Sequence, residues 1–194
     1  MRRLAAMFAV ALATVTVLAL APPASPAAAD TFGGCYGASS AEGCVPDNFN
    51  HWMCLSGTVD ANFQNAINGA MLNLDNQTSY ARFSESPVSA CNSLTDLVWM
   101  QVSGIGARGD YSCLAFNNEG ECERARLRLN PDVLTNAANR LKTACHELGH
   151  SVGLKHGISG VDNTSYVDCM RSGAITSGFN NYDAHHVTHA NNGV

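Results

Sequence analysis

Charged residues are few in this sequence, and none of them gather into a lysine- or arginine-rich run. Of its 194 residues, 14% are Asp, Glu, Lys or Arg, and the acidic ones outnumber the basic ones by 16 to 11. Proteins that bind nucleic acid cluster positive charge to neutralise phosphates, and membrane-surface binders carry basic amphipathic stretches. The composition therefore argues against nucleic acid and against a membrane as partners.

The sequence also lacks closely spaced cysteine pairs. No C-x-x-C pattern occurs, although the chain contains eight cysteines. Zinc sites built from cysteine alone use such pairs to bring two thiolates to one ion. A cysteine-only zinc site is therefore not expected.

The first 29 residues have the pattern of a secretory signal peptide. Arg2 and Arg3 form a charged start, residues 4–21 are apolar, and the alanines at 27–29 suit cleavage. A transmembrane helix would need about 20 uninterrupted apolar residues, but three prolines lie between residues 22 and 26. The arginine pair has no further support as a twin-arginine signal, so we expect ordinary secretion. The remaining chain, residues 30–194, has a net charge of −7, since two of the 11 basic residues are removed.

The cysteines all follow the expected signal peptide. An even number of cysteines in an exported chain predicts a disulfide framework. Their spacing favours two local bridges, Cys35 with Cys44 and Cys113 with Cys122, the second across the turn residues 117–120. The other pairings stay open. The eight positions are Cys35, Cys44, Cys54, Cys91, Cys113, Cys122, Cys145 and Cys169.

Residues 30–57 are predicted to be irregular, and the first helix is predicted after them. The segment 30–57 is rich in Gly, Ser, Asn and Cys and has no helical or strand period, so disulfides are expected to hold it. From Asp60 to Asp75, apolar residues recur at three- and four-residue steps, and Asp60 can cap the first backbone N–H groups. We expect an amphipathic helix over this range.

Strands and a second helix are predicted downstream. Residues 97–102 form a compact apolar run typical of a buried strand, and 113–116 and 124–130 bracket a turn. In residues 124–130, apolar residues alternate with polar ones, which favours a strand with one solvent-exposed face, located at a sheet edge. A helix is expected from about Thr135 to Gly153, and another from about Asn181. This order, without internal repeats, predicts an α+β domain over residues 58–194.

The motif with the clearest chemistry lies at the end of the second helix. Residues 146–156 read His-Glu-Leu-Gly-His-Ser-Val-Gly-Leu-Lys-His. Histidines four apart project from one helix face, so His146 and His150 can reach one cation at ~2.0–2.1 Å. Gly153 can take positive φ and turn the chain so that His156 returns to the metal. Three neutral nitrogens leave a fourth position for water, which is typical of catalytic zinc. We therefore expect one Zn²⁺ per chain.

Glu147 is the expected general base. It points about 100° around the helix from His146, which suits contact with the bound water rather than with the metal. Its carboxylate can accept a proton from that water and later give it to the leaving amine. Two helical histidines alone can also be ordinary surface residues. The added Gly153 and His156 at the required spacing favour the functional interpretation.

The sequence resembles the metzincin clan of zinc endopeptidases over roughly residues 58–190. The five defining positions of the clan's long motif are matched by His146, Glu147, His150, Gly153 and His156. The resemblance implies a zincin domain with a twisted mixed sheet, a long N-terminal helix, an active-site helix ending at Gly153, an irregular C-terminal subdomain and a terminal helix. It further implies that 126–130 is the edge strand that binds extended polypeptide substrates, and that Met170 lies beneath the zinc ligands. A secreted, monomeric endopeptidase is expected.

Several features leave alternatives open. Gly157 after the third ligand leaves the subfamily undecided, with matrixin- and snapalysin-like families as candidates. Residues 42–47 resemble the matrixin pro-segment in which a cysteine blocks zinc, although the even cysteine count favours a disulfide for Cys44. Tyr182 is a candidate for steadying an oxyanion. Further candidates are a second metal cluster at His185, His186 and His189, ligand-orienting roles for Asp162 and Asp168, and a structural role for His51.

Two rival functions remain at this point. A zinc hydrolase of cell-wall amides would share His146, Glu147 and His150 but would not require the Gly153–His156 extension. A secreted, disulfide-bonded binding module could retain a metal site without catalysis. The intact Glu147 argues against that second rival.

Overall fold

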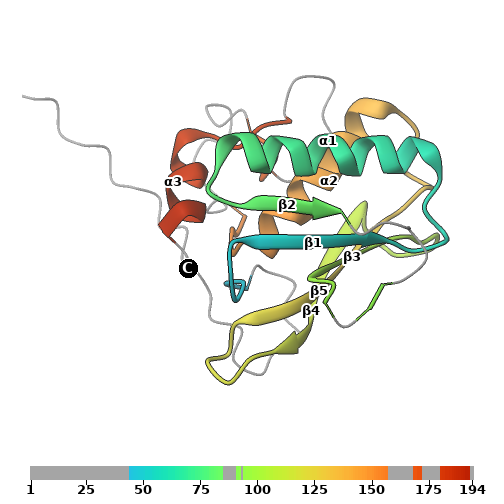
Figure 1. The fold of residues 1–194 in the computed structure, drawn as a ribbon. Helices are drawn as coiled ribbons and strands as arrows, with labels where there is room; N and C mark the ends of the chain where they lie inside the picture. The colour runs from blue at the N-terminus through green and yellow to red at the C-terminus, as the bar shows by residue number, and fades with distance from the viewer. Residues whose placement is uncertain (1–43, 85–90, 93, 157–167, 172–179, 193–194) are drawn as a thin grey trace, which may run out of the picture.

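The computed structural model describes residues 44–84, 91–92, 94–156, 168–171 and 180–192, and it shows a mixed α+β fold (Figure 1). This confirms the expected fold class at that level. The expected signal peptide lies outside the described residues. The described elements are β1 (Asn50–Leu55), α1 (Ala61–Gln77), β2 (Ala81–Ser84), β3 (Leu97–Gln101), β4 (Gly109–Phe116), β5 (Cys122–Leu129), α2 (Ala137–Ser151) and α3 (Ala184–Asn192).

The sheet is mixed, as predicted. Its strand order is β2-β1-β3-β5-β4, with β1 parallel to both β2 and β3, and β3 parallel to β5. Strand β4 alone runs antiparallel, paired with β5 through a hairpin whose turn includes Gly120 at φ 85°. The antiparallel strand β4 therefore forms one edge of the sheet.

The prediction that residues 124–130 lie at the sheet edge is wrong. Strand β5 lies inside the sheet, hydrogen-bonded to β3 on one side and to β4 on the other. Its polar positions have partners on β4, because Arg128 forms an ion pair with Asp110 and Arg126 donates to the Ser112 hydroxyl. Cross-strand partners of this kind satisfy a polar face without an edge position. The edge strand on this side of the sheet is β4.

The prediction that residues 30–57 lack regular structure is wrong for Asn50–Leu55. These residues form β1, which lies between β2 and β3. Both Met53 and Leu55 are buried in the core, while Trp52, the residue before Met53, is 42% exposed. The period was obscured because Cys54 is buried as well, so that the alternation lasts for only part of the strand.

A capping residue marks the start of each of the two long helices, and for α1 it is the predicted Asp60. The Asp60 carboxylate accepts hydrogen bonds from the backbone N–H groups of Asn62 and Phe63, at 2.8 and 3.1 Å, at the start of α1. The Asn136 side chain accepts from the Asn139 N–H, at 2.9 Å, at the start of α2. These bonds satisfy donors that have no partner inside the helix. The predicted helices are confirmed.

Helices α1 and α2 pack against each other over one face of the sheet, and α3 lies beside the end of α1 (Figure 1). Inward-facing residues of β3 and β5 meet α2 in a core that includes Trp99, Leu127, Leu129 and Leu148, each fully buried. Burial of such side chains provides the main drive for folding, at roughly 25 cal/mol per Å² of apolar surface. Within the described residues, no helix combines the length and the apolar character that crossing a membrane would need.

Disulfides join distant parts of the described chain. The predicted bridge between Cys113 and Cys122 is confirmed, and it crosses the β4–β5 hairpin. Two bridges that the spacing left open join Cys54 to Cys91 and Cys145 to Cys169. Cys44 is also disulfide-bonded. Its expected partner, Cys35, lies outside the described residues, and the bonded state of Cys44 contradicts the alternative in which its free thiol blocks zinc.

Candidate metal centre

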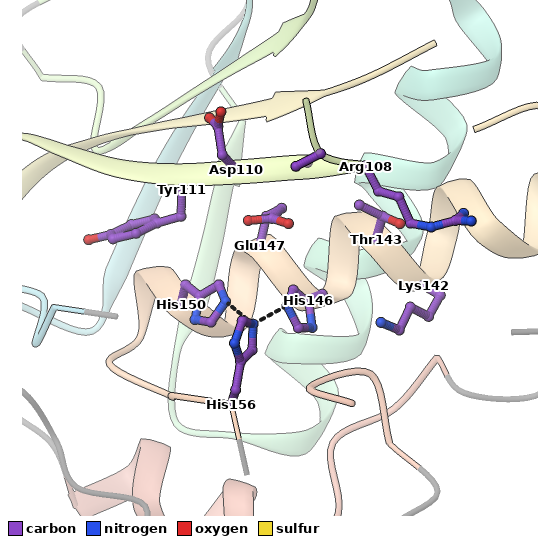
Figure 2. A pocket seen from close by; sticks show the side chains of 11 residues that line it. Arg108, Asp110, Tyr111, Lys142, Thr143, His146, Glu147, His150 and His156 are labelled. Carbon is purple, nitrogen blue, oxygen red and sulfur yellow. Dashed lines mark hydrogen bonds between the residues drawn. The ribbon is translucent and has the colours of Figure 1, made fainter. Parts of the chain in front are cut away.

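Three histidines converge at the end of α2. The Nε2 atom of His156 lies 2.7 Å from that of His146 and 3.2 Å from that of His150 (Figure 2). His146 and His150 are buried, and His156 is exposed at the mouth of the site. The sequence motif therefore brings together the three residues that were expected to meet, and the arrangement can hold one metal ion.

The turn after α2 explains how His156 reaches the other two histidines. Gly153 has φ 84°, and its N–H donates to the His150 carbonyl, while the Leu154 N–H donates to the Gly149 carbonyl. This pair of bonds is a Schellman cap, which requires a left-handed residue that glycine supplies with little strain. The chain thereby reverses within three residues and returns His156 to the helix.

Backbone carbonyls hold the two buried rings. The Nδ1 atom of His146 lies 2.8 Å from the Cys169 carbonyl oxygen, and that of His150 lies 2.7 Å from the Leu154 carbonyl oxygen. A carbonyl only accepts, so each Nδ1 carries the hydrogen. In the neutral ring Nε2 then presents a lone pair. Such contacts fix the tautomer and orientation that a metal-binding histidine needs.

The electrostatic environment keeps the buried histidines neutral. Burial, with a smaller contribution from the nearby His156, lowers the pKa of His150 to about 4. Burial likewise lowers the pKa of His146 well below its usual range, with the neighbouring His150, Lys142 and His156 acting in the same direction. Neutral rings with converging lone pairs repel one another unless a cation lies between them. The donor set therefore fits a divalent cation such as zinc, which binds neutral imidazole nitrogen.

Glu147 lies between strand β4 and the three histidines (Figure 2). Its side chain packs so closely on Gly109 that a Cβ atom there would come within 2.8 Å of Oε1. Burial, together with the Asp110 charge, raises the pKa of the Glu147 carboxyl to about 8, against the opposing effect of the Lys142 ammonium. The carboxyl group thus lies beside the histidines without joining their cluster.

A cleft of about 330 Å³ opens over the histidines and Glu147. Strand β4 forms one wall through Gly109, Asp110 and Tyr111, and α2 forms the floor. Because β4 is an edge strand, one row of its backbone N–H and C=O groups faces away from β5. The strand beside the candidate site is therefore β4 rather than the expected 126–130.

The segment 168–171 packs beneath α2. Met170 is buried, and a Cβ atom at Gly149 would come within 2.2 Å of its Sδ atom, so a larger residue there would require Met170 to move. The Tyr182 hydroxyl is buried and donates to the Cys145 carbonyl at 2.8 Å. The Tyr182 side chain is not among those that line the cleft, so its position gives no support to an oxyanion role.

A second cluster joins this segment to α3, but its members differ from the expected ones. His186 forms an ion pair with Asp168, and its Nδ1 atom lies 3.3 Å from Asp183 Oδ1. Burial alone would lower the pKa of His186, but hydrogen bonds to Asp168 and Asp183 and their charges raise it to about 10. The described contacts therefore show His186 paired with carboxylates, and Asp168 bonds to His186 instead of to a ligand imidazole. The side chain of His185 lies outside the described residues, so the expected histidine cluster stays a prediction.

Of the remaining residues singled out from the sequence, the structure describes His51 but not Asp162. His51 is buried against the Tyr80 ring, with its Nε2 atom 3.5 Å from the Ser151 hydroxyl, as a structural role requires. Asp162 and the loops expected to wall the substrate pocket lie outside the described residues.

Two cationic residues of the cleft were not singled out from the sequence. Lys142 and Arg108 both line it, from α2 and from the residue before β4. The sequence contained one indication that Lys142 lies near the site, because Lys142 precedes His146 by four positions and so shares its helix face. For Arg108, only tertiary structure places it there.

Comparisons with known proteins do not identify the chain. A scan against protein-family models gave no match, and a search of curated proteins gave no relative. The functional interpretation therefore depends on the geometry of the site and on the motif that forms it.

Proposed function

We propose that this protein is a secreted, zinc-dependent endopeptidase of the metzincin type that hydrolyses internal peptide bonds in extended polypeptides. The observation that carries the proposal is the convergence of His146, His150 and His156 beside Glu147, on the floor of a cleft bordered by an edge strand. The disulfides fit an oxidising, extracellular location.

Strand β4 would bind the substrate backbone. An extended peptide can add to a free sheet edge through main-chain hydrogen bonds, which give affinity without depending on side-chain identity. Such binding would hold the peptide along the cleft wall formed by Gly109–Tyr111, directly opposite the three histidines. The position of β4 at the sheet edge, beside the cleft, therefore supports an extended polypeptide as the substrate.

Glu147 would move the protons of the reaction. His146, His150 and His156 would hold a zinc ion, which would supply a Lewis acid and a water of lowered pKa. The Glu147 carboxylate accepts a proton from the attacking water, and the carboxyl group then donates it to the leaving nitrogen. Its burial against Gly109 keeps it at the required place and limits competing hydrogen bonds with bulk water.

A cleavage assay with metal removal and return tests the proposal. The purified protein should cleave casein, lose this activity when a chelator removes the metal, and regain it when zinc is added back. A zinc-binding module without catalytic function would take up the same zinc and cleave nothing. A hydrolase of cell-wall amides would leave casein intact and cleave peptidoglycan fragments instead.

The control for this assay is a surface carboxylate. Glu123 is exposed on β5 and does not line the cleft. The Glu123→Gln variant should therefore show the same loss and return of activity as the unmodified chain. Absence of cleavage by fully zinc-loaded protein would overturn the proposed endopeptidase function.

A further inference from the structure

One end of the cleft carries two positive charges. Lys142 and Arg108 lie at the end beyond His146, whereas Tyr111 lies toward the opposite end near His150 (Figure 2). The end marked by Lys142 and Arg108 is called the cationic end below.

Lys142 is an unusual residue for its position, because it is only 4% exposed. An isolated buried ammonium is costly, and buried lysines normally pair with a carboxylate. Here Nζ donates to the Arg171 carbonyl oxygen, which uses one of its three hydrogens. Among the described residues, no carboxylate forms an ion pair with Lys142.

The nearby acidic residues do not fill this role. The Asp110 carboxylate is engaged by Arg128, whose Nε donates to it at 2.7 Å and whose Nη2 makes a second bond. Glu147 attracts the ammonium only at longer range. The positive charge of Lys142 is therefore left without a contacting anion in the part of the chain that the structure describes.

Arg108 adds a second cationic side chain, and one of its donor groups has no acceptor within the described residues. Its Nη1 atom is buried and has no hydrogen-bond partner within the described residues. It lies close enough to Lys142 for the two charges to repel, which contributes to lowering the Lys142 pKa to about 8 after the larger effect of burial. Two cations at one end of a cleft, with donors left over, form a site that is complementary to an anion.

We propose that Lys142 and Arg108 form a carboxylate-binding subsite, which selects peptides carrying a carboxylate within about two residues of the bond that is cut. The spacing follows from the helix. Four residues separate Lys142 from His146, or ~6 Å along the axis at 1.5 Å per residue, and an extended peptide covers this in about two residues. The inference rests on the proposed endopeptidase function and adds a substrate class to it.

Two sources can supply the carboxylate, namely an acidic side chain or the carboxyl terminus of the peptide. Matched peptides distinguish them. One series places Glu or Gln at each of the two positions on either side of the cleaved bond, and a second compares a free C-terminal acid with its amide. Glu and Gln have the same shape, so the ratio of their kcat/KM values reports the charge alone.

The unmodified protein should prefer the carboxylate peptide at one position by about tenfold or more, since hydrogen bonds to charged groups are strong. Lys142→Gln keeps a donor for the Arg171 carbonyl but removes the charge, so it should reduce this ratio to about threefold or less. Arg108→Gln should reduce it as well. A role of Lys142 in anchoring Arg171 alone would instead lower both kcat/KM values equally and leave the ratio unchanged.

Arg140→Gln is the matched control, because it removes one positive charge from the same helix. The Arg140 guanidinium lies over the Phe63 ring and does not line the cleft. This variant should keep the full preference for the carboxylate peptide. Zinc content must be measured for each variant so that changes in metal occupancy are not mistaken for changes in specificity.

Binding measurements separate failure of the subsite from failure of the proposed function. The Glu and Gln peptides are titrated against the Glu147→Gln protein, which does not need to cleave them. Tighter binding of the carboxylate peptide, reduced by adding Lys142→Gln, supports the subsite even where no cleavage is seen. Equal affinities for both peptides, or a kcat/KM ratio near one in the unmodified protein, would overturn the subsite while leaving an observed peptidase activity intact.

Discussion

At the residue scale, local spacing was enough to predict that His146, His150 and His156 converge and that Glu147 lies beside them. His146, Glu147 and His150 share two turns of one helix, and Gly153 and His156 follow in the cap, so all five positions depend on short-range geometry. The carbonyl of Cys169 and the guanidinium of Arg108 could not be predicted in this way. They reach the site through tertiary packing of segments far apart in the sequence.

Replacing Glu147 tests the proposed proton transfer. Glu147→Gln keeps the size of the side chain and its packing on Gly109 but removes the basic oxygen. Zinc should stay bound while kcat falls by about 10²–10⁴-fold, the usual contribution of general-base catalysis. Kinetics and metal content are to be measured on one preparation. Undiminished turnover at full zinc occupancy would rule out Glu147 as the base.

Replacing His156 tests the third ligand. His156→Ala removes the nitrogen that lies closest to both other Nε2 atoms. Zinc affinity, measured by competition with a chromophoric chelator, should fall by more than about 100-fold. Mutation of a residue that only hydrogen-bonds to a ligand typically lowers metal affinity by about 10–100-fold, and loss of a ligand itself should cost more. His189→Ala, outside the three-histidine cluster, serves as the control. Unchanged zinc affinity in His156→Ala would exclude it as a ligand.

At the element scale, helices were predicted better than strands. The apolar period of α1 and α2 extends over several turns, and capping residues mark where each helix begins. Strand β1 is too short to show a clear period, and the alternation in β5 was mistaken for that of an edge strand. Strand neighbours are set by long-range pairing, which one strand's pattern does not encode.

The contact between α3 and the segment 168–171 has a testable consequence for the metal site. Asp168 is buried, accepts the Met170 N–H at 3.0 Å and pairs with His186 of α3. The adjacent Cys169 carbonyl accepts from His146 Nδ1. Asp168→Asn should therefore weaken zinc binding by about 10–100-fold, as expected for a residue that supports a ligand.

The same substitution should also lower stability. Breaking a buried ion pair by removing one partner costs about 3–5 kcal/mol, because the remaining charge is left buried. Chelator competition must therefore be carried out under conditions where the variant is folded, as judged by circular dichroism. Thr188→Ala on the exposed face of α3 is the control for both readouts. Full zinc affinity in folded Asp168→Asn would show that the contact is only structural.

At the scale of the whole molecule, one disulfide pairing within the described residues could be predicted from the sequence and two could not. The Cys113–Cys122 bridge was predictable because a hairpin places its two ends together. The Cys54–Cys91 and Cys145–Cys169 bridges join segments 37 and 24 residues apart, and only the completed fold brings them close. The Cys145–Cys169 bridge also links α2 to Cys169, whose carbonyl oxygen accepts the hydrogen bond from His146. The packing that forms the core therefore also positions the candidate metal site.

Global stability should depend on pH through His186. Its pKa is raised to about 10 by Asp168 and Asp183, despite the opposing effect of burial, whereas in the unfolded chain it is about 6.5. A raised pKa in the folded state stabilises the protein fully below the unfolded value. This stabilisation should therefore be complete below pH ~6.5, decline as the pH rises further, and be lost above pH ~10.

Comparison with His186→Gln isolates this contribution, because other titrating groups cancel in the difference. The free energy of unfolding is measured in urea, on metal-free protein with its disulfides intact, at several pH values from 6 to 10. The destabilisation caused by His186→Gln should be largest at pH 6 and shrink steadily toward pH 10, whereas that of Thr188→Ala should not change with pH. A difference for His186→Gln that stays constant across this range would show that His186 is not held as a cation in the folded protein, and that packing rather than charge joins α3 to the segment beneath the metal site.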